Sequence, residues 1–256
     1  MAPSSNRILF KATAAEFLGT ALFLFTTISA VTSYGAGVLA PIGVAAVFGL
    51  TIFVLEIGLG ETCGGHFNPA VSLGVFINGG MGYLQFIAYW LAQVLGAITG
   101  ACFARLCVGD PVYEANGRAI NIVGTGHSTG RAFLAEVIAT GFLVLVVLQT
   151  AGTKRNKKNR QARAWAPLAI GLVVLVDHLA LVSIDGCSIN PARSLGAATA
   201  GWSKTHASWN QMWIFVIAPL VGGAVAGLFK RVVIPWGDKA AGVDEEAAPA
   251  SGDSKV

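Results

Sequence analysis

The sequence GGHFNPAVSLG, residues 64–74, recurs in modified form as GCSINPARSLG at residues 186–196. In both copies Asn-Pro-Ala opens a run of small and apolar residues that is only about a dozen long, too short to cross a bilayer. Asparagine is a favoured helix N-cap, and proline fits the first helical position. Each copy therefore predicts a short re-entrant segment, over residues 67–77 and 189–200, whose helix begins at the proline.

The residues around these two motifs are predominantly apolar. Hydrophobic residues make up 54% of the 256 positions and charged residues 12%, which is atypical of a soluble domain. A spanning helix needs roughly 20 apolar residues. The sequence thus predicts an all-α membrane protein with six transmembrane helices, at residues 12–34, 41–60, 83–106, 131–151, 165–184 and 213–233.

The two halves of the chain resemble each other. Glutamate stands near the start of the first span of each half, and Asn68 lies 52 positions after Glu16 while Asn190 lies 54 positions after Glu136. Because each half has three spans, the second copy starts on the opposite side of the membrane. We therefore expect an inverted repeat, and half-helices that enter from opposite faces. Its predicted parts are a first repeat at 12–106, a connecting loop at 107–130 and a second repeat at 131–233.

Basic residues indicate the orientation. They concentrate in TKRNKKNRQAR at residues 153–163 and near the two termini, so the positive-inside rule places residues 1–11 and a disordered tail at 234–256 in the cytoplasm, with 107–130 on the other side. No aromatic face accompanies them, which argues against nucleic-acid binding.

The four cysteines form no CxxC pair, so we expect neither a metal site nor a cofactor.

The paired Asn-Pro-Ala motifs suggest a chemistry. If the oxygen of each asparagine caps its helix, the amide NH2 remains as a donor at the membrane midplane. Two helix N-termini add partial positive charge, which disfavours cations and suits a neutral hydrogen-bond acceptor such as water. The copies differ three residues after the asparagine, where the first has Val71 and the second has Arg193. A membrane-embedded arginine is costly and indicates a functional position.

Over residues 12–233 the repeat and its motifs HFNPAVSLG and CSINPARSLG resemble the aquaporin (major intrinsic protein) family. The resemblance implies a right-handed helical bundle with a pore in every protomer, a homotetramer, and passive flow in both directions. It also assigns the pore motifs to six residues: Asn68, Pro69, Ala70, Asn190, Pro191 and Ala192.

The same resemblance implies an aromatic/arginine constriction that selects the permeant. Its positions fall on Phe48, His178, Cys187 and Arg193, the set found in water-selective members, and Ser194 stands where glycerol-type members tend to carry aspartate. Glu16 and Glu136 match the glutamates thought to support the re-entrant loops. The Cys187 thiol is a possible mercurial site. Asp177 and Glu56 depart from the usual pattern, and the sequence does not assign their roles.

The leading interpretation is a passive water channel that excludes ions and protons. Its expected location is a plasma membrane rather than an internal membrane. A facilitator of glycerol or other small neutral solutes is the alternative, and the two differ in glycerol uptake. A coupled secondary transporter also uses inverted repeats and broken helices. It would need a coupling-ion site, which the donors at the midplane disfavour. No nucleophile and base pair points to an enzyme.

Overall fold

The computed structural model describes residues 5–34, 40–151, 164–201 and 206–233, and all regular elements in these ranges are helices. Six of them are long and apolar enough to span a membrane. These are α1 (Ser5–Tyr34), α2 (Ala40–Cys63), α4 (Tyr83–Val108), α6 (Thr129–Thr150), α9 (Ala166–Asp185) and α11 (His206–Val232). The predicted six-span, all-α membrane architecture is confirmed. The basic run at 153–163 and the tail at 234–256 lie outside the described residues.

Two spanning helices begin earlier than hydropathy indicates. Helix α1 begins at Ser5 and α11 at His206, whereas the apolar pattern suggested starts at residues 12 and 213. Hydropathy marks only the part of a helix that lies in lipid, and a helix can continue into water with polar residues. Between α4 and α6, the segment expected as a loop contains a short helix, α5 (Asp110–Ala115), and a 3-10 turn, η1 (Gly117–Ala119).

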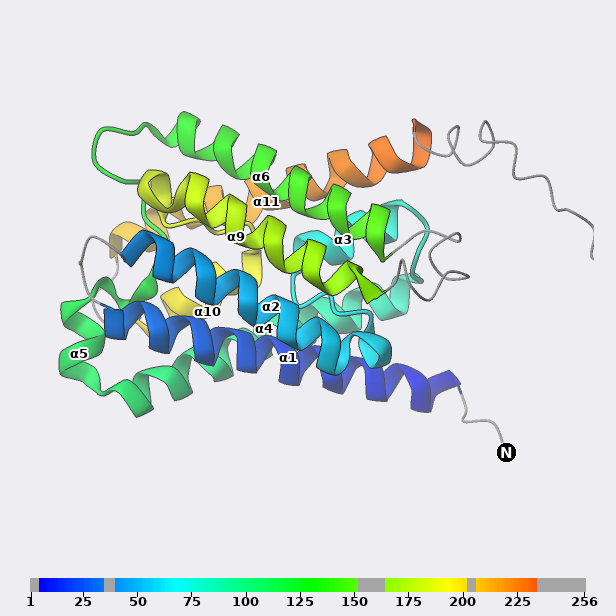
Figure 1. The fold of residues 1–256 in the computed structure, drawn as a ribbon, viewed down its shortest axis with the longest axis horizontal. Coiled ribbons are helices and arrows are strands. Elements are labelled where there is room, and N and C mark those ends of the chain that lie inside the picture. Colours follow the sequence, from blue (N-terminus) through cyan, green and yellow to red (C-terminus); the bar gives the residue numbers. More distant parts are fainter. Residues whose placement is uncertain (1–4, 35–39, 152–163, 202–205, 234–256) are drawn as a thin grey trace, which may run out of the picture.

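The two half-helices are α3 (Pro69–Ile77) and α10 (Pro191–Ala200), and both lie among the long helices (Figure 1). Each packs mainly on the last spanning helix of the other half, α3 on α11 and α10 on α4. The described ends of the chain, at the start of α1 and the end of α11, lie at the same end of the bundle, as an even number of spans requires (Figure 1).

Glycines let each half-helix pack closely against the last spanning helix of the other half. A Cβ at Gly196 would lie 2.7 Å from the carbonyl carbon of Ala97, and one at Gly74 would lie 3.0 Å from the carbonyl oxygen of Gly223. Close backbone approach of this kind is how membrane helices associate without a hydrophobic driving force. The outer surface carries large apolar side chains, which suits contact with lipid.

Candidate functional site

An asparagine caps the N-terminus of each half-helix. The side-chain Oδ1 of Asn68 accepts a hydrogen bond from the backbone N–H of Ala70 at 2.8 Å. Asn190 Oδ1 accepts from Ala192 N at 3.0 Å and from Arg193 N at 3.3 Å. These bonds satisfy donors that a helix N-terminus otherwise leaves unpaired. The cap therefore fixes the orientation of each side-chain amide.

The amide nitrogens join the two half-helices directly. Asn68 Nδ2 donates to the carbonyl oxygen of Ile189 at 2.8 Å, and Asn190 Nδ2 donates to that of Phe67 at 2.9 Å. The accepting residues have φ near +46° and +44°, a left-handed conformation that non-glycine residues seldom adopt. Each amide carries two N–H groups, so this reciprocal pair uses one and leaves one for a permeant.

Two buried glutamates hold the backbone just before these asparagines. Glu16 accepts from the N–H groups of His66 at 2.8 Å and Phe67 at 2.7 Å. Glu136 makes the same pair of bonds with Ser188 at 2.6 Å and Ile189 at 2.7 Å. Both carboxyl groups are fully shielded from solvent. These bonds are the contacts that Glu16 and Glu136 need if they support the re-entrant loops.

The four residues expected at the constriction come from α2, α9, α10 and the loop before α10. The rings of Phe48 and His178 stack with their centroids 4.0 Å apart. The guanidinium carbon of Arg193 lies 5.2 Å from the centroid of the Phe48 ring. Cys187 is completely buried in the loop, with φ of 53°, and its N–H donates to Asp185 Oδ1 at 3.0 Å. The structure thus brings Phe48, His178 and Arg193 into contact.

Two polar atoms at this constriction have complementary hydrogen-bonding roles. His178 Nδ1 lies 2.8 Å from the carbonyl oxygen of Val174, and because a carbonyl only accepts, Nδ1 carries the hydrogen. In the neutral ring Nε2 is then an acceptor. Within the described ranges neither His178 Nε2 nor Arg193 Nε has a hydrogen-bond partner, although both are buried. The constriction thus offers one acceptor and one donor.

The family model of the major intrinsic proteins matches residues 4–230. The chain belongs to the major intrinsic protein family. Its similar relatives include the probable aquaporin PIP2-7 of Oryza sativa subsp. japonica, 39% identical over 237 residues, a match that covers 88% of this chain and 80% of the relative. Aquaporin PIP1-1 of Musa acuminata is 37% identical over 230 residues, with 88% and 79% covered.

Among solved structures, this major intrinsic protein is similar to the aquaglyceroporin from Plasmodium falciparum. The TM-score is 0.75 with 24% sequence identity, and the match covers 90% of this chain and 99% of the other. At that identity the likeness concerns the fold. It supports the arrangement of six spans and two half-helices and does not extend to the permeant.

Asn121 holds Arg193, and no sequence motif predicts this role. Asn121, 1% exposed, accepts through Oδ1 from Arg193 Nη1 and from Ser194 Oγ, the latter at 2.7 Å. Its own Nδ2 donates to the carbonyl oxygen of Asp185 at 3.2 Å. Arg193 Nη1 also donates to Ala119 O at 2.8 Å. Asn121 stands in a connecting segment without periodicity, so no local pattern distinguishes it from an ordinary loop asparagine.

Two cavities lie at the site and share lining residues. The narrower is lined by Asn68, Asn190 and His178 together with apolar side chains. The wider opens between the ends of α2, α6 and α9 and is lined by Glu56 and Glu61. His66 borders both cavities. The Glu56 carboxylate, which the sequence left without a role, therefore lies in the wide cavity, where Gly60 and Gly65 leave room for it.

Asp177, which like Glu56 departs from the usual family pattern, does not border either cavity. It is 4% exposed and lies on α9 next to His178. Its Oδ2 has no hydrogen-bond partner in the part of the chain that the structure describes. We have no physical account of why an acidic residue occupies this position.

Proposed function

We propose that this protein is a passive, bidirectional water channel, driven by osmotic gradients, that excludes ions and protons. The observation that carries the proposal is the pair of unpartnered polar atoms at the constriction, His178 Nε2 and Arg193 Nε. Water both donates and accepts hydrogen bonds, so a water molecule can donate to His178 Nε2 or accept from Arg193 Nε. The naming of similar relatives as aquaporins supports the same conclusion.

The permeation path follows from the order of polar groups. Water entering the wide cavity passes His66 and reaches the remaining N–H groups of Asn68 and Asn190. It then moves past the apolar lining of the narrower cavity to His178, whose ring stacks on Phe48 near Arg193. Sparse polar groups replace part of the hydrogen bonding of bulk water without binding any one molecule tightly, which favours rapid exchange.

Charge and desolvation account for the exclusion of ions. Two helix N-termini and the Arg193 guanidinium place positive charge along the path, which repels cations. Removing the water shell of an ion has a larger cost, which the few polar groups here do not offset. Protons are disfavoured at the asparagine pair, because a water that accepts from these amides has its oxygen engaged and points its hydrogens away from both.

The size of the constriction favours water over glycerol. The rings of Phe48 and His178 stack near Arg193 and narrow the proposed path, so we expect a single water to pass and a three-carbon solute to be excluded. For the assembly, we propose a homotetramer in a plasma membrane, with both termini in the cytoplasm and no enzymatic activity. The apolar outer surface supports the membrane location, and the similarity to relatives named aquaporins supports a channel.

Reconstitution tests the proposed function. Purified protein in proteoliposomes is mixed with an impermeant osmolyte or with glycerol in a stopped-flow instrument, and light scattering follows the volume. We expect water flux well above that of protein-free liposomes and glycerol uptake at the protein-free rate. Substantial glycerol uptake would instead identify a facilitator of small neutral solutes. Water flux that requires an ion gradient would point to a coupled transporter.

A further inference from the structure

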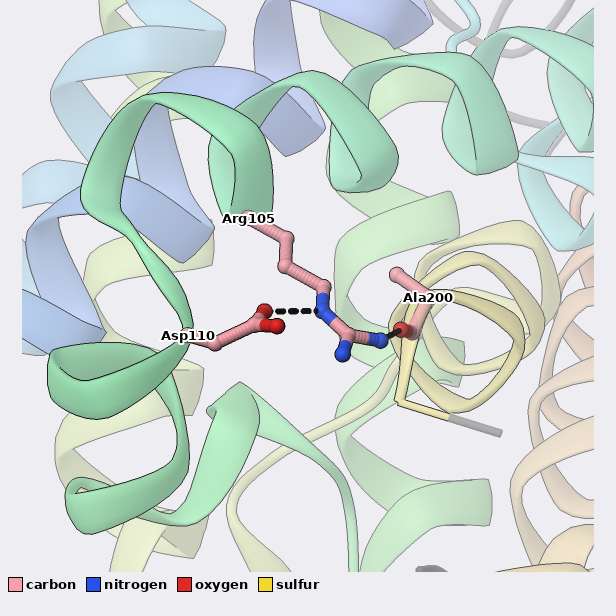
Figure 2. A network of polar contacts seen from close by, with 3 residues as sticks. All are labelled: Arg105, Asp110 and Ala200. Atoms are coloured by element: carbon pink, nitrogen blue, oxygen red, sulfur yellow. Dashed lines mark hydrogen bonds and ion pairs between the residues drawn. The ribbon is translucent and has the colours of Figure 1, made fainter. Parts of the chain in front are cut away.

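An arginine from α4 binds the C-terminus of half-helix α10. Arg105 Nη1 donates to the carbonyl oxygen of Ala200, the last residue of α10, at 2.6 Å. Its Nε forms an ion pair with Asp110 Oδ1 at 2.6 Å, and the two contacts hold the guanidinium between α5 and α10 (Figure 2). The same guanidinium lies 5.6 Å from the ring centroid of Tyr113. The last carbonyls of a helix lack partners within it, and a cation there complements the helix dipole.

The other half-helix ends in a related way. The carbonyls of its last turn accept from the backbone of the following turn: Gly74 from Asn78, Phe76 from Gly79 and Val75 from Gly80. The remaining carbonyl, that of Ile77, accepts from Arg231 Nη1 at 2.9 Å. All four terminal carbonyls of α3 thus have partners, and the last one requires an arginine from α11.

The two arginines occupy equivalent positions in the inverted repeat. A Cβ at Gly96 would press on the carbonyl of Phe17, and one at Gly222 would press on that of Val137. Phe17 and Val137 each directly follow a loop-supporting glutamate, so these two glycines correspond. Each arginine lies nine positions after its glycine. Each therefore reaches from the last span of one half to the half-helix of the other.

The two arginines differ in how firmly they hold the C-termini of their half-helices. Arg231 is exposed and makes one hydrogen bond to its half-helix, whereas Arg105 has a side chain that is 28% exposed and is also oriented by Asp110. The more strongly held half-helix, α10, is the one that carries Arg193, seven residues before Ala200. A displacement of the C-terminus along the helix axis is transmitted over about 10 Å to Arg193, because a helix of this length is stiff.

We infer that Arg105, oriented by Asp110, is a positioning residue for the constriction: it fixes the C-terminus of α10 and thereby the depth at which Arg193 meets Phe48. This inference rests on the proposed function for its effect on flux, but the anchoring itself is measurable without flux. The same geometry makes Arg231 the corresponding anchor of α3, which carries no constriction residue.

Hydrogen–deuterium exchange of the full-length protein in lipid nanodiscs measures the anchoring. We expect Arg105→Met to speed exchange of the α10 amides near residue 201 by about tenfold, the effect of losing one charge-assisted hydrogen bond. Arg105→Lys, which keeps the charge and one donor at a time, should restore most of the protection. Arg231→Met should affect α3 and leave α10 unchanged. Arg131→Met, which removes an exposed cation at the start of α6, is the matched control.

Stopped-flow measurements per reconstituted channel then test the effect on the constriction. We expect Arg105→Met and Asp110→Asn to lower the ratio of water to glycerol permeability at least threefold, with recovery in Arg105→Lys and no change in Arg131→Met. Unchanged exchange in α10, or an unchanged permeability ratio in a variant whose α10 exchanges faster, would overturn the inference. If Arg105→Met does not assemble, Asp110→Asn decides by the same criteria. A wild-type protein that conducts no water would refute the proposed function, whereas exchange still reports on the anchor.

Discussion

The side chain of Asn68 makes two hydrogen bonds with different roles. Its oxygen caps α3, and its nitrogen binds the backbone before α10, 121 positions away. Asn190 repeats both bonds in the opposite direction. A single amide therefore starts a helix, joins the two halves and retains one N–H for the pore.

Replacing Asn68 with alanine should lower both stability and flux. The variant loses the cap and the cross-helix bond, which together contribute about 2–3 kcal/mol. It also removes a donor from the path, so we expect a fall in water permeability per channel. Thermal unfolding in detergent and stopped-flow scattering measure the two effects. Ser128→Ala is the control, because Ser128 caps α6 away from the cavities. Equal losses in both variants would contradict the assigned role.

The thiol of Cys187, in the loop before α10, predicts inhibition by mercurials if it lies at the proposed constriction. A bulky, soft metal bound to this buried sulfur would block the narrow path. Cys187→Ser should retain water flux and abolish the inhibition, whereas Cys107→Ser, which alters an exposed cysteine at the end of α4, should remain sensitive. Stopped-flow traces with and without mercuric chloride distinguish the two. Inhibition that persists in Cys187→Ser would assign the sensitive site to another cysteine, such as Cys63.

At the scale of elements, the half-helices depend on close contact with the spans of the other half. Helix α10 lies against α4 at Gly196, and α3 lies against α11 at Gly223. Their N-termini meet at the asparagines, and arginines hold both C-termini. Each half-helix is thus fixed at its start, along its length and at its end, although it is too short to be stable alone.

Gly196→Val should disrupt this contact. The first added carbon would lie 2.7 Å from Ala97, and backbone cannot yield as a flexible side chain does. Overpacking of this kind costs about 1–3 kcal/mol or more. Gly58→Val is the matched control, because a Cβ there meets no neighbouring atom within 4 Å. Melting temperatures of the two variants in the same detergent provide the comparison. A similar melting temperature for both would show that the α4 and α10 contact tolerates separation.

For the whole molecule, the proposed constriction draws on residues from four separate segments. Phe48 comes from α2, His178 from α9, Cys187 from the following loop and Arg193 from α10. Asn121, from the segment between the repeats, holds Arg193 and Ser194. Both halves therefore build the path, and neither half contains a complete constriction.

Removing the His178 ring should change what passes through the molecule. His178→Ala opens space beside Phe48 and removes the acceptor Nε2. We expect glycerol permeability to rise above the protein-free rate while water flux persists, as measured in parallel osmotic gradients. Leu179→Ala, which shortens a side chain that is 47% exposed on the outer surface of α9, should leave the ratio unchanged. A His178→Ala protein that still excludes glycerol would place the size limit elsewhere.

The sequence by itself determined the six spans, the inverted repeat, and the start of both half-helices. These features depend on neighbours in the chain: runs of apolar residues, and an asparagine beside a proline. Only the tertiary structure decided the reciprocal amide bonds, the hydrogen bond between Asn121 and Arg193, and the hydrogen bond between Arg105 and Ala200. These contacts join residues 72 to 123 positions apart. Their existence depends on how closely glycine-lined helices approach, a distance that no local pattern encodes.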